Sequence, residues 1–283
     1  MILRPQYCYN GYYYFYGDKK FSTHNRAFRY GDAIFETVYV RYTECIALEE
    51  HIKRLHEGMR AMYMEIPDDF NYRFFRRKII RLLNKNHHIK TARVRIEVFR
   101  NNGGLYTPTD DSVSFVIESE PLDLLSPFEN THRLKLDVCP SVVNVYSSLS
   151  EFKTSSSLRY TVAGKWKTIN KLDDCIILNE KGEVSETMCS NVFMVKDEKC
   201  YTPSLKCGCI NGIMRNLVVN LLRKNDIYID DDAHLTVRDL EEADEIFITN
   251  SISWIQVVNV FKSSRYYSAL SKHIKKLFKE QYF

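Results

Sequence analysis

Two stretches with helical spacing lie between runs of strand-forming residues in the first part of the chain, and this order constrains the fold more than any other feature. Residues 48–64 place apolar side chains three or four positions apart, and residues 69–84 do the same, which predicts two amphipathic helices. β-Branched and aromatic residues are frequent in the runs on either side, which predicts strands at 33–40, 92–99 and 113–118. Strands, then helices, then strands indicate an α+β domain.

Glycine marks two of the predicted turns. Asn10 and Gly11 separate two tyrosine-rich runs, and Asn-Gly is a strong signal for a two-residue β-hairpin turn. A second loop, 100–108, contains Gly103 and Gly104 and ends in proline. Such a loop could cradle a ligand, but paired glycines are also what a hairpin end needs to reach positive φ, and the local pattern favours the hairpin end.

The second half of the chain also mixes strands and helices. Residues 120–131 contain two prolines and few periodic features, and we expect them to link two domains, 1–119 and 132–283. Beyond the linker, strands are predicted at 133–138, 175–178, 192–196, 200–202, 245–249 and 255–261. Helical spacing predicts helices directly after Lys153, at 212–224, from Thr236 and at the end of the chain.

Length and composition exclude several classes of protein. A chain of 283 residues with 45% hydrophobic and 27% charged residues suits a globular protein with two domains or one large one. The formal charge is only +4 with basic and acidic residues interleaved, which argues against nucleic-acid binding. The basic cluster within residues 73–81 is predicted to be the solvent-facing side of a helix. No apolar run approaches the ~20 residues that cross a bilayer, and the first residues lack the apolar core of a secretory signal.

The eight cysteines are predicted to be reduced thiols of a cytosolic protein. Cys207 and Cys209 stand too close together for an ordinary zinc pair, and no Cys-x-x-Cys or His-x-x-His accompanies them. We therefore expect no metal site.

Lys153 stands at the end of an extended polar run and directly before a segment with helical spacing, at Leu158, Val162, Trp166 and Ile169. A lysine at such a junction is most often an ordinary solvated charge. The alternative is a buried amine that forms an imine, and the local sequence does not decide between the two.

Three other motifs carry residues that could do chemistry. Glu186 lies among small and polar residues between two predicted strands, where it could be solvated or could face a cationic ligand. Gly212 introduces a predicted helix whose free N–H groups could bind phosphate, as at any helix that begins with glycine. Arg54 borders the apolar stripe of the first long helix and could equally be a surface arginine.

Together and in this order, the motifs resemble the class IV, fold-type IV pyridoxal-phosphate enzymes, which comprise branched-chain and D-amino-acid aminotransferases and aminodeoxychorismate lyase. The resemblance covers nearly the whole chain, with markers at 29–36, 51–55, Lys153, Glu186, 190–193, 201–203, 211–215 and 243–250. It implies a two-domain α+β fold like that of D-amino-acid aminotransferase, with a smaller N-terminal α/β sandwich and a larger C-terminal pseudo-barrel. It also implies pyridoxal 5'-phosphate as the cofactor.

The resemblance implies a role for each site residue. Lys153 is the catalytic lysine, which holds the cofactor as an aldimine and moves a proton once it is released. Glu186 faces the pyridine nitrogen and keeps it protonated, so that the ring can accept electrons. The other cofactor-binding residues are Arg54, Asn191, Ile213, Met214, Asn250 and Ser251. Tyr30 and Arg100 are the candidates for substrate binding, with Arg100 placed at the substrate carboxylate.

These roles imply transfer of an amino group between an amino acid and a 2-oxo acid. Leu158 stands where branched-chain enzymes generally have tyrosine, and the sequence at 211–215, which includes Met214, is more similar to that of the lyase. Ser156 replaces an asparagine that D-amino-acid aminotransferases and the lyases often have, and Tyr39 stands where relatives often have arginine or lysine. Two alternatives stay open: aminodeoxychorismate lyase, which forms 4-aminobenzoate and pyruvate, and a catalytically idle relative. The resemblance further implies a cytoplasmic homodimer that acts on small molecules, with each active site completed by a loop of the partner.

Overall fold

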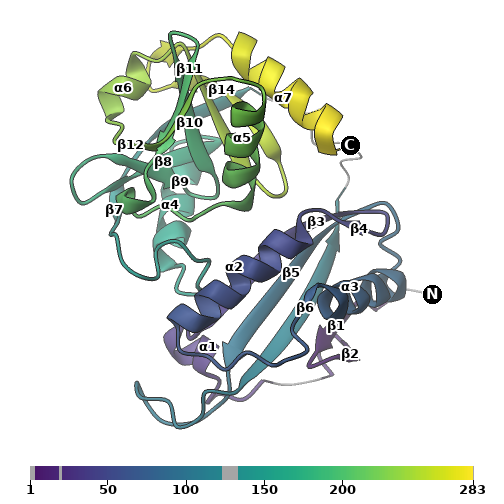
Figure 1. Cartoon of the computed structure of the whole chain (residues 1–283). Helices are drawn as coiled ribbons and strands as arrows, with labels where there is room; N and C mark the ends of the chain where they lie inside the picture. The colour runs from purple at the N-terminus through teal and green to yellow at the C-terminus, as the bar shows by residue number, and fades with distance from the viewer. Residues whose placement is uncertain (1–3, 19–20, 123–132, 283) are drawn as a thin grey trace. The chain divides into compact units, whose positions relative to one another are not determined.

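The computed structural model describes residues 4–18, 21–122 and 133–282. By its internal contacts the chain divides into two compact units (Figure 1). Unit 1 contains Met1–Leu125 and Phe152–Ser157, and unit 2 contains Ser126–Glu151 and Leu158–Phe283. The segment Phe152–Ser157, which includes Lys153, therefore belongs with unit 1 although unit 2 precedes and follows it in the sequence.

The predicted division into domains 1–119 and 132–283 with a linker at 120–131 stays a prediction. Positions 120 and 121 are the last two of a strand that ends at Pro121. Positions 123–131 lie outside the described residues.

Unit 1 contains a sheet with two long helices against it. Its strands are β1 (Gln6–Tyr9), β2 (Tyr12–Phe15), β3 (Ala33–Arg41), β4 (Glu44–Cys45), β5 (Thr91–Arg100) and β6 (Val113–Pro121). Its helices are α1 (Arg26–Tyr30), α2 (Leu48–Ala61) and α3 (Tyr72–Asn86). Over the described ranges the strands lie in the order β2-β1-β6-β5-β3-β4, and all pairs are antiparallel. Helices α2 and α3 cover the same face of this sheet (Figure 1).

Apolar side chains at every second position of β3 and β5 determine which face of the unit 1 sheet packs against the helices. Ile34 and Val38 of β3 pair with Val98 and Val94 of β5, and all four side chains are buried against the apolar stripes of α2 and α3. The predicted helices and strands of this region are confirmed, with ends shifted by a few residues. Helix α3 starts later than expected because the Asn71 side chain accepts a hydrogen bond from a backbone N–H and caps the helix there.

Both predicted hairpin turns form. Asn10 and Gly11 adopt positive φ values of 47° and 85°, and the flanking residues Tyr9 and Tyr12 pair. The loop with Gly103 and Gly104 connects β5 to β6, and both glycines have positive φ.

Unit 2 contains a nine-stranded mixed sheet over the residues described. Its strands are β7 (Leu134–Asn144), β8 (Asp174–Asn179), β9 (Val184–Thr187), β10 (Asn191–Lys196), β11 (Lys199–Pro203), β12 (Ile229–Ala233), β13 (Glu245–Asn250), β14 (Trp254–Phe261) and β15 (Ser264–Arg265). They follow the order β12-β11-β10-β13-β14-β7-β8-β9, and β15 pairs with β14. The pairs β11–β12, β7–β14 and β7–β8 are parallel.

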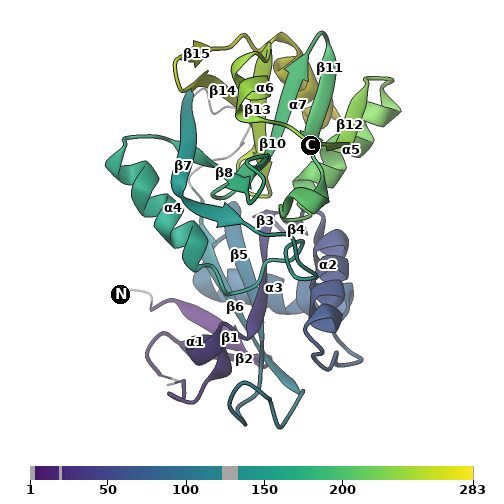
Figure 2. The same cartoon turned by 90° about the vertical axis from the view of Figure 1, so that its left-hand side faces the viewer.

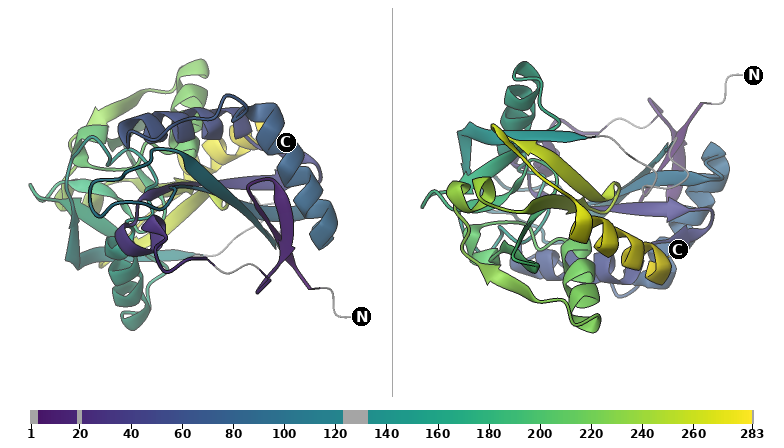
Figure 3. Two further views of the ribbon diagram at one scale, coloured as in Figure 1. Left: turned by 90° about the horizontal axis from the view of Figure 1, so that it is seen from below. Right: turned by 90° about the horizontal axis from the view of Figure 1, so that it is seen from above.

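The helices of unit 2 pack on this sheet. They are α4 (Leu158–Ile169), α5 (Ile213–Lys224), α6 (Val237–Glu241) and α7 (Ala269–Tyr282), with a short 3₁₀ turn, η2, at Leu205–Cys207. Helix α4 lies beside β7 and β8 (Figure 2). Helices α5 and α7 contact each other and β13, and Figure 3 shows α7 in yellow near the end of the chain.

Two features of unit 2 differ from the prediction. The sequence does not predict strands β9, β12 and β15, because β9 is short and polar, β12 is acidic and β15 is very short. Helix α4 forms, but Leu158 and Ile169 of its predicted apolar stripe are 75% and 68% exposed. The helix instead meets the sheet through the small, fully buried Ala163 and its partly buried aromatic neighbours.

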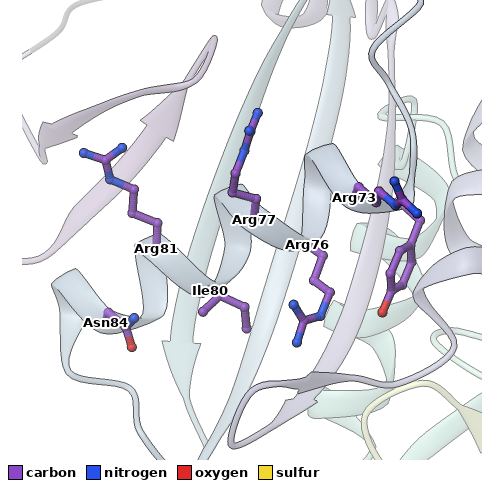
Figure 4. Close-up of a pocket in the computed structure, with 7 residues that line it drawn as sticks. Arg73, Arg76, Arg77, Ile80, Arg81 and Asn84 are labelled. Atoms are coloured by element: carbon purple, nitrogen blue, oxygen red, sulfur yellow. The ribbon is translucent and has the colours of Figure 1, made fainter.

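The basic face of α3 behaves largely as predicted. Arg73, Arg76, Arg77 and Arg81 are exposed and line a shallow surface pocket (Figure 4). Lys78 differs, because its Nζ reaches back to donate to the Gly11 carbonyl at 3.2 Å and becomes half-buried. Among the described residues, no helix is long and apolar enough to span a membrane.

Candidate active site

Lys153 lies on an extended segment that pairs with an edge of β3. The Phe35 N–H donates to the Lys153 carbonyl at 2.9 Å, and the Ser155 N–H donates to the Ala33 carbonyl at 2.8 Å. The Lys153 side chain is half-buried, and its Nζ lies 5.1 Å from the centroid of the Phe35 ring, within the range of a cation–π contact. Backbone pairing with a sheet therefore fixes the position of this lysine.

The Phe35 ring also contacts a charged pair on β5. The Arg95 Cζ lies 3.6 Å from the ring centroid, and the Arg95 Nε pairs with the Glu97 carboxylate at 2.9 Å. The Ser155 hydroxyl donates to the other oxygen of Glu97 at 2.7 Å. These residues gather beside Lys153 on the face of the unit 1 sheet opposite the helices. Sequence reasoning missed them, although Phe35, Arg95 and Glu97 fall on the alternate positions of β3 and β5 that the apolar pattern leaves outside the core.

Arg54 is buried between α2 and the sheet, so the surface-arginine interpretation is wrong. Its Nε and Nη2 donate to the two oxygens of Glu36 on β3 at 2.8 and 2.6 Å, and the His51 Nδ1 lies 2.6 Å from the same carboxylate. Burial by itself raises the pKa of Glu36, but the charges of Arg54 and His51 outweigh it and lower that pKa to about 2. Glu36 is therefore an anion that orients Arg54. The sequence could have identified Glu36 as functional, because it is a carboxylate at a core position of an apolar strand.

Tyr30 lies at the end of α1 near the glycine loop of unit 1. It lines a small pocket together with His24, Gly103 and Gly104. Its ring lies 5.0 Å from the guanidinium carbon of Arg26, which is buried.

Arg100, the predicted ligand of the substrate carboxylate, is buried and already makes several contacts. Its Nε pairs with Asp32 at 3.0 Å, and it also pairs with Asp111. The remaining donors reach the carbonyls of Met62 at 2.5 Å and Tyr63 at 3.1 Å. A substrate carboxylate would have to compete with these acceptors.

Glu186 lies in the short strand β9, which falls between β8 and β10 in the sequence. The side chain is 3% exposed. One carboxylate oxygen accepts from the Tyr160 hydroxyl at 2.6 Å and the Asn144 amide at 2.9 Å, and the other accepts from the Ile210 N–H at 3.1 Å. The pKa of Tyr160 is raised, mainly by burial and to a lesser extent by the adjacent negative charge of Glu186. The hydroxyl therefore stays protonated and donates to the carboxylate.

Gly212 begins α5 as predicted. A Cβ at this position would lie 1.8 Å from the Asn191 Oδ1, so no other residue fits without displacing Asn191. The Asn191 amide in turn donates to the Ile210 carbonyl at 2.8 Å. No side chain caps the N-terminus of α5. The N–H groups of Ile213 and Met214 thus stand in the first turn of a helix, where an anion is favoured.

Asn250 and Ser251 lie at the turn between β13 and β14. The Asn250 amide nitrogen donates to the Ser190 hydroxyl at 2.9 Å, and its oxygen accepts from the N–H groups of Ile252 and Ser253 at 2.9 and 2.7 Å. Next to it, the buried Thr249 Oγ1 has no hydrogen-bond partner among the residues that the structure describes. A buried hydroxyl of this kind is where an additional acceptor or donor is expected.

The structure distributes the predicted residues over both units. Unit 1 holds Lys153, Arg54, Tyr30 and Arg100, and unit 2 holds Glu186, Asn191, Ile213, Met214, Asn250 and Ser251. Within unit 2, Glu186 and the start of α5 are joined through Ile210, which contacts both Glu186 and Asn191. The individual roles of these residues stay predictions.

A family model described as amino-transferase class IV matches residues 33–260, most of the chain. The chain belongs to this family. Aminodeoxychorismate lyase from Vibrio harveyi is 26% identical over 239 residues, which cover 83% of this chain and 85% of that protein. D-alanine aminotransferase from Listeria monocytogenes is 26% identical over 231 residues, which cover 80% and 77%. The class IV prediction is thus confirmed.

A solved structure shows the same fold. The branched-chain amino acid aminotransferase from Escherichia coli superposes with a TM-score of 0.86 at 19% identity, covering 99% of this chain and 94% of that one. This likeness confirms the predicted two-domain α+β fold of type IV.

Proposed function

We propose that this class IV enzyme uses pyridoxal 5'-phosphate to move an amino group between an amino acid and a 2-oxo acid. The observation that carries the proposal is the buried Glu186 carboxylate, which three donors hold in place. A carboxylate oriented in this way can stabilise a cation placed against it. The protonated ring nitrogen of the cofactor is such a cation.

The residues present fit the cofactor. The uncapped first turn of α5 and the unpartnered Thr249 hydroxyl offer donors for a phosphate in unit 2, and we assign Asn250, Ser251 and Asn191 to the surroundings of that phosphate. For unit 1, the family resemblance implies Arg54 as a further cofactor-binding residue. When bound, pyridoxal phosphate serves as an electron sink for carbanion chemistry at the substrate.

In this proposal, Lys153 carries the cofactor and moves the substrate proton. A lysine suits this role because its primary amine can form an imine and, once free, can accept and donate a proton. The half-buried position of Lys153 and the nearby Arg95 support this role. Pairing of Phe152–Ser157 with β3 keeps the amine in one place, as proton transfer requires.

Two arginines compete for the substrate carboxylate. Arg100 is the candidate from the sequence, with Tyr30 beside the same loop. Arg95 is the candidate from the geometry, because it shares the Phe35 ring with Lys153 and is less engaged than Arg100. Arg95→Lys should raise the KM for the amino acid if Arg95 binds the carboxylate, whereas Arg100→Lys should do so in the other case. Unchanged KM values in both variants would contradict both assignments.

We further propose that the enzyme works as a cytoplasmic homodimer, as the family resemblance implies. The eight cysteines are free thiols, and Leu158, Val162 and Ile169 expose apolar surface on α4 that a second copy could cover. Analytical ultracentrifugation tests the dimer, and a monomer at micromolar concentration would contradict it.

Assays of purified protein separate the three functions. Amino transfer from a panel of L- and D-amino acids to 2-oxoglutarate supports the leading proposal. Release of pyruvate and 4-aminobenzoate from 4-amino-4-deoxychorismate without amino transfer would replace it with the lyase. A protein that takes up no pyridoxal phosphate, judged by visible absorbance, would be a catalytically idle relative.

A further inference from the structure

Three different ligand types converge at a place in unit 2 to which the proposed function gives no role. The Cys207 Sγ lies 3.7 Å from the Glu183 Oε2 and 3.8 Å from the His234 Nδ1, and that nitrogen lies 3.0 Å from the Glu183 Oε1. One ligand atom from each residue lies within 4.8 Å of the others. These separations are those of neighbouring ligands around one ion, since bonds of about 2.0–2.3 Å at tetrahedral angles put ligand atoms roughly 3–4 Å apart.

Local structure fixes each of the three groups. The Asn179 side chain accepts from the Glu183 N–H at 2.9 Å and donates to the Glu183 carboxylate at 2.7 Å, so both the turn and the carboxylate are oriented. Cys207 ends the 3₁₀ turn that Ser204 caps, and is fully buried. His234 follows β12 directly and is about half exposed. A buried thiol with a half-exposed imidazole gives the place an entry path for an ion.

The geometry does not suit a nucleophilic triad. In such a triad one ring nitrogen of the histidine faces the nucleophile and the other faces the carboxylate. In this protein the His234 Nδ1 faces both the Cys207 thiol and the Glu183 carboxylate. Convergence of three groups on one point is the arrangement that a metal ion requires. The neighbouring Cys209 belongs to another contact, because its thiol donates to the Ser204 carbonyl.

We propose that Glu183, Cys207 and His234 bind a divalent transition metal of the zinc class. One thiolate, one imidazole and one carboxylate with an open fourth position suit Zn²⁺ in tetrahedral geometry. The thiol proton is released to solvent as the sulfur–metal bond forms. The spacing of the cysteines in the sequence gave no sign of this site, because its ligands come from three segments that are far apart in the chain.

The site would brace two segments that also hold Glu186. Residues 183–186 carry Glu183 and Glu186, and residues 207–210 carry Cys207 and Ile210, whose N–H donates to Glu186. A metal bound by Glu183 and Cys207 at one end of these two segments would fix the distance between Glu186 and Ile210 at the other end. The three ligands themselves have no role in the proposed reaction.

Cobalt spectroscopy on the full-length protein tests the site. Metal content is first measured on the protein as purified, then the metal is removed with a chelator and Co²⁺ is added, and difference spectra exclude the absorbance of any bound cofactor. We expect one equivalent of Co²⁺ with the d–d bands of a tetrahedral ion and a thiolate-to-cobalt charge-transfer band, all displaced by Zn²⁺. Cys207→Ala should lose the charge-transfer band, and His234→Ala should weaken Co²⁺ binding at least tenfold.

Two further variants keep the proposal falsifiable if Cys207→Ala fails to fold. Asn179→Ala leaves all three ligands in place but removes the group that orients Glu183, and should weaken Co²⁺ binding about 10- to 100-fold. His24→Ala replaces an exposed histidine of unit 1 and should leave Co²⁺ binding unchanged. The proposal is wrong if Co²⁺ gives no charge-transfer band, or if binding is the same in His234→Ala and His24→Ala.

Discussion

Replacing Glu36 with glutamine tests whether the buried anion holds Arg54 in position. In the wild type, the side chains of Glu36 and Arg54 are only 1% and 7% exposed, and the carboxylate accepts both guanidinium hydrogen bonds. The variant leaves the Arg54 charge buried without its counter-ion. Removing one partner of such a pair costs about 3–5 kcal/mol.

The lowered pKa of Glu36 corresponds to an effect of similar size on stability. Lowering this pKa from its ordinary value of 4.5 to about 2 corresponds to about 3 kcal/mol of stability above pH 5. Because the folded-state pKa lies below that of the unfolded chain, this stability is present at neutral pH and is lost as the pH falls from about 4.5 to about 2. The difference between wild type and Glu36→Gln should shrink over the same range.

Urea unfolding at pH 7 followed by circular dichroism measures the loss, and hydrogen exchange of β3 and α2 localises it to unit 1. Glu120→Gln is a matched control, because Glu120 also pairs with an arginine across the unit 1 sheet but is 70% exposed. Such an exposed pair is worth less than about 1 kcal/mol. Equal losses in the two variants would refute the account of Arg54.

Three further variants probe the Glu186 region. Glu186→Gln should lower kcat roughly 100-fold with cofactor still bound, because the ring nitrogen loses its anion; a change below threefold in steady-state assays would contradict this role. Tyr160→Phe removes one donor to Glu186 and should weaken cofactor binding about tenfold in a titration of tryptophan fluorescence, whereas unchanged affinity would count against the hydrogen bond. Gly212→Ala should destabilise the protein by about 1–3 kcal/mol in urea unfolding, because the new Cβ meets Asn191 at 1.8 Å. Gly164→Ala meets only the sulfur of a flexible methionine at 2.8 Å and should cost less, so the reverse order would be evidence against the packing at Gly212.

Much of the fold could be predicted from the sequence because its elements carry strong local signals. The apolar periodicity of α2 and α3, the Asn10 turn and the alternation in β3 and β5 each identify an element without help from distant residues. Strands β9 and β12 could not be found in this way. Their residues become strands by pairing with β8 and β11, and this pairing overrides weak local preference.

The candidate site was predictable as a set of motifs but not as a set of contacts. Arg54 and Glu186 stand out by type and order, yet their partners Glu36 and Tyr160 are determined by strand register and helix packing. Arg95 lies near Lys153 because β5 and the segment Phe152–Ser157 flank β3 on opposite edges. The three proposed metal ligands, Glu183, Cys207 and His234, likewise come from three separate segments. Their spacing in the sequence therefore does not predict that they lie together.

Mapping the lysine that binds the cofactor tests the central claim most directly. Protein loaded with pyridoxal phosphate is reduced with borohydride, digested and analysed by mass spectrometry. The account predicts that the added cofactor mass is found on the peptide containing Lys153 and that Lys153→Arg, which keeps the charge, abolishes both the label and activity. Label on a different lysine with activity retained in Lys153→Arg would contradict it.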